Sequence, residues 1–288
     1  MNKDLIQQRL DTYKCQTILE TEDALREITQ EIILAGLSRT NFFKHTAFQG
    51  GTCLRIFYGL NRFSEDLDFI TKKPWSDFNL MSFLNTVQDE LKAFGYNLEI
   101  VDRSKTNNAV KKAFLKDDSI GKILNIHHLN TNRFIKKIKI KLEVDTNPPK
   151  GSHVENKFND FPFAYSITLQ DLPSLFAGKL HAVLCREYVK GRDWYDLIWY
   201  MSRKTLINYD FLTSALIQQG SWKNSKIEIN AAWCIKELKN KIKSLDWNAA
   251  KNDVKRFLNP NEVASLEIWG KDFFIDRVDN FNNTCLKK

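Results

Sequence analysis

The sequence predicts an α+β protein, in which a half that mixes helices and strands is followed by an all-helical half. Apolar and charged residues alternate over 135–145, which is typical of a strand with one buried face. From Ser174 onward, apolar residues recur at helical spacing instead. Of the 288 residues, 43% are hydrophobic and 12% aromatic, enough to bury a core, so a disordered chain is excluded.

Helices and strands alternate in the first half. Thr17 and Glu20 fit a capping box at the start of the first predicted helix, and the apolar positions after them keep the 3.6-residue period. Polar and apolar residues alternate from Ser64 to Ile70, which predicts a strand. The predicted helices are 17–37, 54–58 and 80–94, and the predicted strands are 64–70, 97–101, 120–128 and 135–145.

A loop with two prolines, Asn147–Gly151, lies in the segment 146–162, which we predict to be a domain boundary. It divides the chain into a core of residues 1–160 with N-terminal helices and a helical domain of residues 161–288. We expect Ser174 to cap the first helix of the second domain. The helices predicted there are 174–189, 192–203, 209–219, 227–243, 247–257 and 260–280.

Positive charge is concentrated in one segment. The chain has 43 Lys and Arg against 35 Asp and Glu, a net charge of +8. Residues 103–141 hold eleven Lys and Arg against Asp117 and Asp118, a net charge of +9, which leaves the rest of the chain at −1. This basic segment either binds the phosphates of an RNA backbone or is an ordinary solvated strand face with a charged loop.

The cell compartment can also be inferred from the sequence. No run approaches the roughly 18 apolar residues that a membrane span needs, and the first residues lack the apolar stretch of a secretory signal. The five cysteines are an odd number without a CxxC pair. Reduced thiols, a cytoplasmic location and no membrane partner are therefore expected.

Acidic residues follow a glycine pair at a spacing that suits nucleotide chemistry. Asp66 and Asp68 come shortly after Gly50-Gly51-Thr52, and a distant strand carries Glu143 and Asp145. Alternate residues of a strand face the same side, so the two aspartates can share a metal site. Mg²⁺ prefers hard oxygen ligands, and nucleotidyl transfer needs the ion held against substrate phosphates. A third carboxylate, Glu143 or Asp145, could complete a two-metal site and deprotonate the attacking hydroxyl.

The glycine pair suits phosphate binding. Gly50 and Gly51 expose backbone N–H groups without a Cβ, and the hydroxyl of Thr52 could add one more donor. Taken alone, a DxD pair is commonly a solvated turn, and a glycine pair is commoner still. Their combination with an acidic strand favours a catalytic site.

Charged residues of the second half admit two interpretations each. Lys179 and Arg186 lie seven residues apart on one expected helix face, where they could hold a triphosphate or simply be solvated. Arg192 and Asp196, four residues apart, could form an ordinary helix ion pair. In the first half, Arg62 could contact a phosphate or brace the loop before the carboxylates.

Four motifs run in order along residues 20–200. They are Phe48-Gln-Gly-Gly-Thr-Cys-Leu-Arg55 continuing to Asn61–Phe69, then Ile138–Asp145, Leu172–Ala182 and Lys190–Leu197. Together they resemble the signature of the AbiEii/AbiGii-type toxin nucleotidyltransferases, members of the DNA-polymerase-β-like nucleotidyltransferase superfamily. The resemblance implies a mixed-sheet polymerase-β-like core, backed by a helical C-terminal domain that completes the nucleotide cleft.

The resemblance also implies residue roles. Asp66 and Asp68 would ligate the metal, with Glu143 favoured over Asp145 as the third carboxylate because it occupies the Lys-x-Glu position of its motif. The expected catalytic residues are Asp66, Asp68, Glu143, Lys179 and Asp193. The residues expected to bind the nucleotide are Gly50, Gly51, Thr52, Arg62, Ser64, Lys179, Arg192 and Asp196.

The implied reaction transfers a nucleoside monophosphate from an NTP to an acceptor hydroxyl and releases pyrophosphate, with Mg²⁺ or alternatively Mn²⁺. The resemblance implies the toxin of a toxin–antitoxin or abortive-infection pair, countered by a cognate antitoxin protein or regulator. The basic segment 103–141 favours an RNA acceptor, first of all the 3′ end of a tRNA. The alternatives are nucleotidylation of a protein or small molecule, and a non-catalytic nucleotide- or RNA-binding module.

Overall fold

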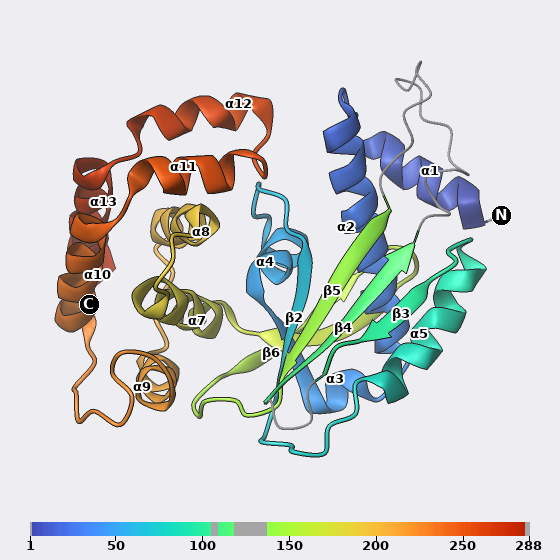
Figure 1. Ribbon diagram of the computed structural model, residues 1–288, viewed down its shortest axis with the longest axis horizontal. Coiled ribbons are helices and arrows are strands. Elements are labelled where there is room, and N and C mark those ends of the chain that lie inside the picture. The colour runs from blue at the N-terminus through green and yellow to red at the C-terminus, as the bar shows by residue number, and fades with distance from the viewer. Residues whose placement is uncertain (1, 105–108, 118–136, 286–288) are drawn as a thin grey trace. The chain divides into compact units, whose positions relative to one another are not determined.

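A computed structural model describes residues 2–104, 109–117 and 137–285 of the chain (Figure 1). The predicted strand 120–128 and much of the basic segment 103–141 lie outside these residues. The described chain forms two compact units. The first unit contains the residues up to Tyr58, Phe63–Pro148 and Glu155–Leu169, and the second contains Gly59–Arg62, Pro149–Val154 and the residues from Gln170 onward.

The first unit is built on a seven-stranded sheet with the order β3-β4-β5-β2-β1-β7-β6. The strands are β1 (Thr46–Gln49), β2 (Asp66–Thr71), β3 (Glu99–Asp102), β4 (Val110–Asp117), β5 (Ile138–Asp145), β6 (Val154–Asn159) and β7 (Tyr165–Gln170). The central strand β2 runs parallel to β5 and antiparallel to β1, so the sheet is mixed. The predicted α+β class with a mixed sheet is confirmed.

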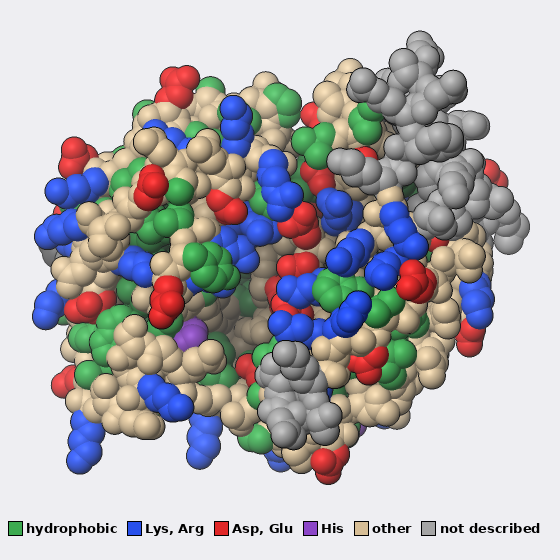
Figure 2. All heavy atoms as spheres, viewed as in Figure 1, with side chains coloured by type: hydrophobic (Ala, Val, Ile, Leu, Met, Phe, Trp, Pro, Cys, Tyr) green, Lys and Arg blue, Asp and Glu red, His purple; other side chains and the backbone are tan. Residues whose placement is uncertain are grey.

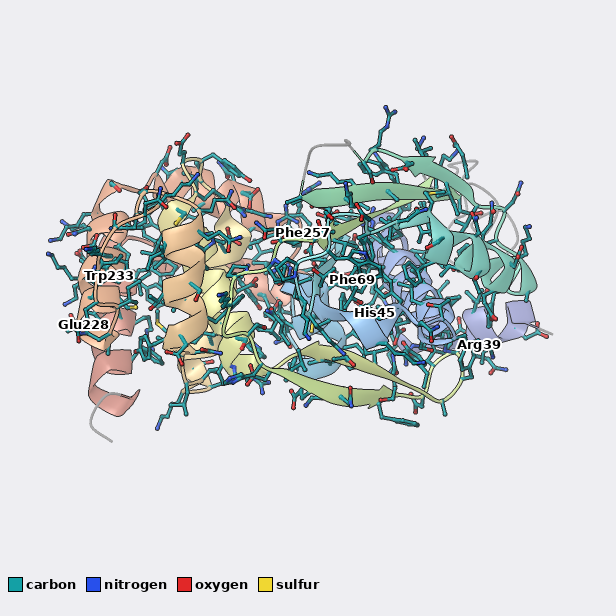
Figure 3. All side chains as sticks on the ribbon, turned by 90° about the horizontal axis from the view of Figure 1, so that it is seen from below. Arg39, His45, Phe69, Glu228, Trp233 and Phe257 are labelled. Atoms are coloured by element: carbon teal, nitrogen blue, oxygen red, sulfur yellow. The ribbon has the colours of Figure 1, made fainter. Side chains whose placement is uncertain are left out.

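Helices cover one face of this sheet. They are α1 (Asn2–Thr12), α2 (Ile18–Ser38), α3 (Phe42–His45), α4 (Gly50–Tyr58) and α5 (Met81–Ala93). Helix α2 packs against α1, α5 and β5, and the alternate residues Ile138 to Val144 of β5 are buried. Phe69 of β2 lies in this core with its ring centroid 4.9 Å from that of Phe42 and 5.2 Å from that of Phe48 (Figure 3). The side chains that alternate with these core residues point to the other face of the sheet.

The second unit is helical and has an aromatic core. Its helices are α7 (Leu172–Cys185), α8 (Gly191–Ser202), α9 (Tyr209–Gln218), α10 (Ala231–Ser244), α11 (Trp247–Lys255), α12 (Pro260–Val263), the 3-10 helix η1 (Ala264–Ile268) and α13 (Lys271–Cys285). Trp247 stacks on Phe274 with ring centroids 4.2 Å apart, and Trp194 contacts both rings. Among the described helices, none has the length and apolar character that crossing a membrane requires.

Several predicted elements have the expected form. The capping box at the start of α2 is confirmed, because the Thr17 side chain accepts the N–H of Glu20 and the Glu20 carboxylate accepts the N–H of Thr17. The prediction of one helix over 260–280 is wrong. The chain instead forms α12, η1 and α13, because the extended backbone of Trp269 interrupts the helix.

Candidate active site

Three carboxylates lie on the open face of the first unit's sheet. Asp66 and Asp68 occupy alternate positions of β2, and Glu143 lies on the neighbouring parallel strand β5, paired with Asp68. All three side chains are half-buried, whereas the intervening Leu67 is fully buried on the other face. Strand alternation and the parallel register therefore bring together the three carboxylates that the sequence singled out.

Gly50 lies directly against this carboxylate row, by which we mean Asp66, Asp68 and Glu143. Helix α4 begins at Gly50, whose φ of +80° is a conformation that favours glycine. A Cβ built on Gly50 would lie 2.5 Å from Oδ2 of Asp68, closer than any real side chain allows. The glycine therefore lets the start of the helix approach the carboxylate, and Gly51 follows in the first turn, where backbone N–H groups lack helical partners.

Thr52 and Ser64 make hydrogen bonds near the start of β2. Thr52 is buried, and its hydroxyl donates to the backbone carbonyl of Asp66. The carbonyl of Ser64 accepts a hydrogen bond from Nε2 of Gln30 on α2, at 3.1 Å. In this structure both residues position the first carboxylate, and their contact with a nucleotide stays a prediction.

Two lysines hold Glu143. Nζ of Lys141 lies 2.6 Å from one carboxylate oxygen of Glu143 and 3.7 Å from Oδ2 of Asp66, while Nζ of Lys112 lies 2.7 Å from the other Glu143 oxygen. Burial alone would raise the pKa of Glu143, but the hydrogen bonds from Lys112 and Lys141 outweigh it and the pKa is lowered. Sequence analysis missed Lys112, because its pairing with Glu143 follows from the antiparallel register of β4 and β5.

Asp145 lies further along the same face of β5. It pairs with Ile70 of β2 rather than with either aspartate, and its side chain accepts the N–H of Asn147. Burial raises the pKa of Asp145 despite this hydrogen bond. The structure thus brings Glu143, and not Asp145, beside Asp68.

The donor set of this face suits a divalent metal ion. Within the ranges that the structure describes, no group of three or more His, Cys, Asp or Glu side chains is arranged to hold a metal. Asp66 and Asp68 nevertheless offer hard oxygen ligands on one face, and Mg²⁺ commonly takes one or two carboxylates together with substrate phosphates and water. These two residues therefore fit a metal that the substrate helps to ligate.

A second cluster of charges is buried in the helical unit. Lys179 of α7 lies 2.7 Å from a carboxylate oxygen of Asp193 and 2.8 Å from one of Asp196, both on α8. Arg62 binds Asp196 through two hydrogen bonds of 2.6 Å each. Arg186 lies 3.0 Å from Asp193, an ion pair without the geometry of a directed hydrogen bond. The structure therefore brings together four residues to which the resemblance assigned a role in the site, and Arg186, which the sequence had paired with Lys179.

Burial and charge act in opposite directions on this cluster. Burial alone would raise the pKa of Asp193 and Asp196, but Lys179 and the arginines outweigh it, so both pKa values are lowered. Burial alone would lower the pKa of Lys179, but the two carboxylates outweigh it and the pKa is raised. All three groups are therefore charged at neutral pH, and the cluster is a buried ionic network.

Two expectations about these helices are wrong. Asp171, and not Ser174, caps α7, because its side chain accepts the N–H of Ser174. Arg186 is the C-cap of α7 with extended backbone, so it lies past the helix face that carries Lys179. The guanidinium of Arg192 lies 4.0 Å from the ring centroid of Phe257. Asp196 pairs with Arg62 and Lys179 instead.

Comparison with known proteins adds family information to this geometry. The family model described as "Nucleotidyl transferase AbiEii toxin, Type IV TA system" matches residues 32–277. The chain resembles the structure of JHP933 from Helicobacter pylori, with a TM-score of 0.53 and 18% identity over 92% of each chain. It also resembles MenT4, a nucleotidyltransferase toxin from Mycobacterium tuberculosis H37Rv, with a TM-score of 0.52 and 15% identity over 97% of this chain and 98% of that one.

At these identities the two structures show a shared fold. A search of curated proteins found no significant match to the sequence. The family model, by contrast, spans most of the chain and includes every carboxylate and lysine of the two charged clusters. The chain therefore belongs to the AbiEii nucleotidyl transferase toxin family of type IV toxin–antitoxin systems, and it is a nucleotidyltransferase.

Proposed function

We propose that this toxin carries out the metal-dependent transfer of a nucleoside monophosphate from an NTP to a hydroxyl of RNA, first of all the 3′ end of a tRNA. The observation that supports this most directly is the row of Asp66 and Asp68 beside Gly50, at the start of α4. It combines metal ligands with backbone N–H donors, the two features that phosphoryl transfer needs most.

Asp66 and Asp68 would hold Mg²⁺ or Mn²⁺ together with oxygens of the NTP. When bound, the ion would neutralise negative charge on the phosphates and polarise the phosphoryl group that is transferred. The N–H groups of the first turn of α4, including that of Gly51, would bind phosphate oxygens, because they have no helical partners and lie at the positive end of the helix dipole. Thr52 would keep α4 against β2 during the reaction.

The cationic side of the second cluster would bind phosphate groups within its own unit. Arg62, Lys179, Arg186 and the half-buried Lys190 carry four positive charges, against two from Asp193 and Asp196. Burial lowers the pKa of Lys190, and neighbouring cations lower it further. An anionic ligand would relieve this repulsion, so we expect Arg186 and Lys190, the more accessible of the four, to contact phosphates.

The acceptor would bind on the open face of β4 and β5. Figure 2 shows Lys and Arg side chains gathered over these strands, next to acidic side chains. Lys112 and Lys116 of β4 and Lys139 and Lys141 of β5 lie on this face, where Lys139 also covers the ring of Phe114 at 4.2 Å. Contacts between lysine and phosphate do not depend on base sequence, so this surface would hold an RNA backbone near the carboxylates.

A transfer assay tests this function. The purified toxin is incubated with total cellular RNA and protein, Mg²⁺ and each of the four radiolabelled NTPs in turn, and the labelled products are separated. We expect label in small RNA with wild-type protein, and a loss of at least about a thousandfold in Asp68→Ala because a metal ligand is removed. Label in protein or small molecules would replace the RNA assignment, and an active Asp68→Ala would overturn the catalytic site.

Membership of a type IV system implies an antitoxin partner. We propose that the antitoxin restores growth by opposing the nucleotidyl transfer itself. A strain that expresses the wild-type toxin together with its cognate antitoxin should grow as well as a strain that expresses Asp68→Ala alone. A toxin that still inhibits growth as the Asp68→Ala variant would separate its toxicity from the transfer.

A further inference from the structure

Both oxygens of Glu143 are already occupied by protein cations. One accepts from Lys141 at 2.6 Å and the other from Lys112 at 2.7 Å. The two ammonium groups come from different strands, β5 and β4, so the pairing depends on the sheet register and not on local sequence. Each oxygen of Glu143 thus already has a cationic partner, and a metal ion at this carboxylate would have to share its oxygens with the two ammonium groups.

Lys141 lies between two of the three carboxylates. Its Nζ is 2.6 Å from Glu143 and 3.7 Å from Oδ2 of Asp66, and its Cα pairs with that of Asp66 across the parallel strands. The Lys141 side chain is 28% exposed and that of Glu143 21%, so this ammonium group is partly shielded from water. It therefore occupies the space where a cation shared by Asp66 and Glu143 would lie.

The charges of the row point the same way. Asp66, Asp68 and Glu143 contribute three negative charges, while Lys112 and Lys141 contribute two positive ones, a net charge of −1. One divalent ion brings the row to +1, which suits an anionic nucleotide. A second ion between Asp66 and Glu143 would have to displace the Lys141 ammonium group, which already neutralises charge there.

We infer that Lys141 replaces the second metal ion of this centre, so that the toxin binds a single divalent ion, at Asp66 and Asp68. Glu143 is then a positioning residue that fixes Lys141, with Lys112 holding its other oxygen, and it does not ligate the metal. The inference rests on the proposed metal-dependent transfer, because it concerns how many ions that site takes.

Metal counting tests this inference without nucleotide transfer. The full chain is titrated with Mn²⁺ alone, and bound ions are counted by electron paramagnetic resonance of the free ion and by equilibrium dialysis. We expect one bound Mn²⁺ in the wild type and in Glu143→Gln, two in Lys141→Met, and none in Asp66→Asn/Asp68→Asn. The matched control Lys137→Met removes the same charge from the same region of chain, next to Glu99, and should leave the count at one.

The outcomes separate the possibilities. Two ions in the wild type with one in Glu143→Gln would make Glu143 a ligand and overturn the inference. A single ion in Lys141→Met, with folding confirmed by circular dichroism, would also overturn it, since removal of the lysine should open the second site. No bound ion in the wild type would overturn this inference alone, because in the proposed function the NTP supplies further metal ligands; the metal dependence is tested by the transfer assay with and without Mg²⁺.

The transfer assay keeps the two proposals distinguishable. Metal-dependent transfer by a wild type that binds two ions would leave the proposed function intact and refute the role of Lys141. Conversely, a count of one that rises to two in Lys141→Met would support the inference even if no transfer to RNA were found.

Discussion

At Gly50, one hydrogen in place of a side chain decides whether α4 can begin against Asp68. An alanine there would have to keep φ at +80° and place Cβ 2.5 Å from a carboxylate oxygen. The backbone strain alone costs about 1–2 kcal/mol. Relief of the clash would move the Asp68 carboxylate away from the position in which we propose that it binds the metal.

Gly50→Ala should therefore lower the rate of nucleotide transfer by at least about tenfold, because small displacements of reacting groups are costly. The rate is measured with labelled NTP at saturating metal. Gly270→Ala is the matched control, since a Cβ at Gly270 meets no atom within 4 Å. Wild-type activity in Gly50→Ala would show that the close approach to Asp68 is not needed.

Asp196 makes stability depend on pH. Its pKa is lowered in the folded chain, whereas an unfolded Asp titrates near pH 4. The Asp196 ion pairs therefore contribute fully above about pH 4, and this contribution is lost as the pH falls through the lower pKa of the folded state. Asp193 behaves in the same way, so acid should weaken the second unit.

Asp196→Asn should lower the free energy of unfolding by about 3–5 kcal/mol at pH 7, because it leaves Arg62 and Lys179 buried with less compensating charge. The loss should shrink below about pH 4, where the wild type also loses the carboxylate charge. Urea denaturation over a pH series measures both effects. The exposed Asp77→Asn should follow the wild-type curve, and an unchanged stability of Asp196→Asn would exclude the buried pair as a source of stability.

The contacts of a single residue could be predicted from the sequence only where its partners are close to it in the chain. Asp66 and Asp68 were correctly expected to share a strand face, because strand alternation is local. Asp196 pairs with Lys179 and with Arg62, which is 134 residues away, whereas the sequence offered only the nearby Arg192 as a possible ion-pair partner. Lys112 was missed for the same reason, since its contact with Glu143 depends on strand register.

Among the elements, α7 shows how a cap supports the charged cluster. Asp171 caps this helix by accepting the N–H of Ser174, and Pro173 follows in its first turn. A free N-terminal N–H would otherwise lack a partner, which costs about 1 kcal/mol when such a cap is replaced by alanine. Because α7 carries Lys179, fraying of its first turn would loosen the contact with α8.

Asp171→Ala should therefore lower the free energy of unfolding by about 1 kcal/mol, whereas Asp171→Ser should retain most of the stability. Urea denaturation gives the difference, and hydrogen exchange of the α7 amides shows whether the loss is local. Equal stability of the alanine and serine variants would mean that the cap does not limit this helix.

Two of the strands that the sequence analysis missed, β4 and β6, have patterns that conceal their burial. In β4 the inward residues are Lys111, Ala113, Leu115 and Asp117, so both faces mix polar and apolar side chains and no period of two appears. Asp117 is satisfied by accepting the N–H of Asn97. In the edge strand β6, exposed Val154 and Phe158 alternate with half-buried polar residues, the reverse of the usual pattern. Strand β5, with clean alternation, was predicted correctly.

For the whole molecule, the two units interleave along the chain. The segment Gly59–Arg62 joins α4 to β2 but belongs to the second unit by its contacts. Its Arg62 is buried against Asp196 with side-chain exposures of 3% and 0%. A polypeptide cut at residue 160, the boundary that the sequence predicts, would therefore lack a cation that the helical half buries.

A fragment of residues 161–288 should consequently be unstable. Removal of one partner from a buried ion pair costs about 3–5 kcal/mol, a large part of the roughly 5–15 kcal/mol that stabilises a whole domain. We expect the fragment to unfold at lower urea concentration than the full chain, and without a sharp transition. Arg62→Met in the full chain isolates the contribution of this residue and should increase hydrogen exchange in α8. If the fragment unfolds as cooperatively as the full chain does, with equal protection of α8, the helical half is independent of Arg62 and the sequence-based boundary describes a true folding unit.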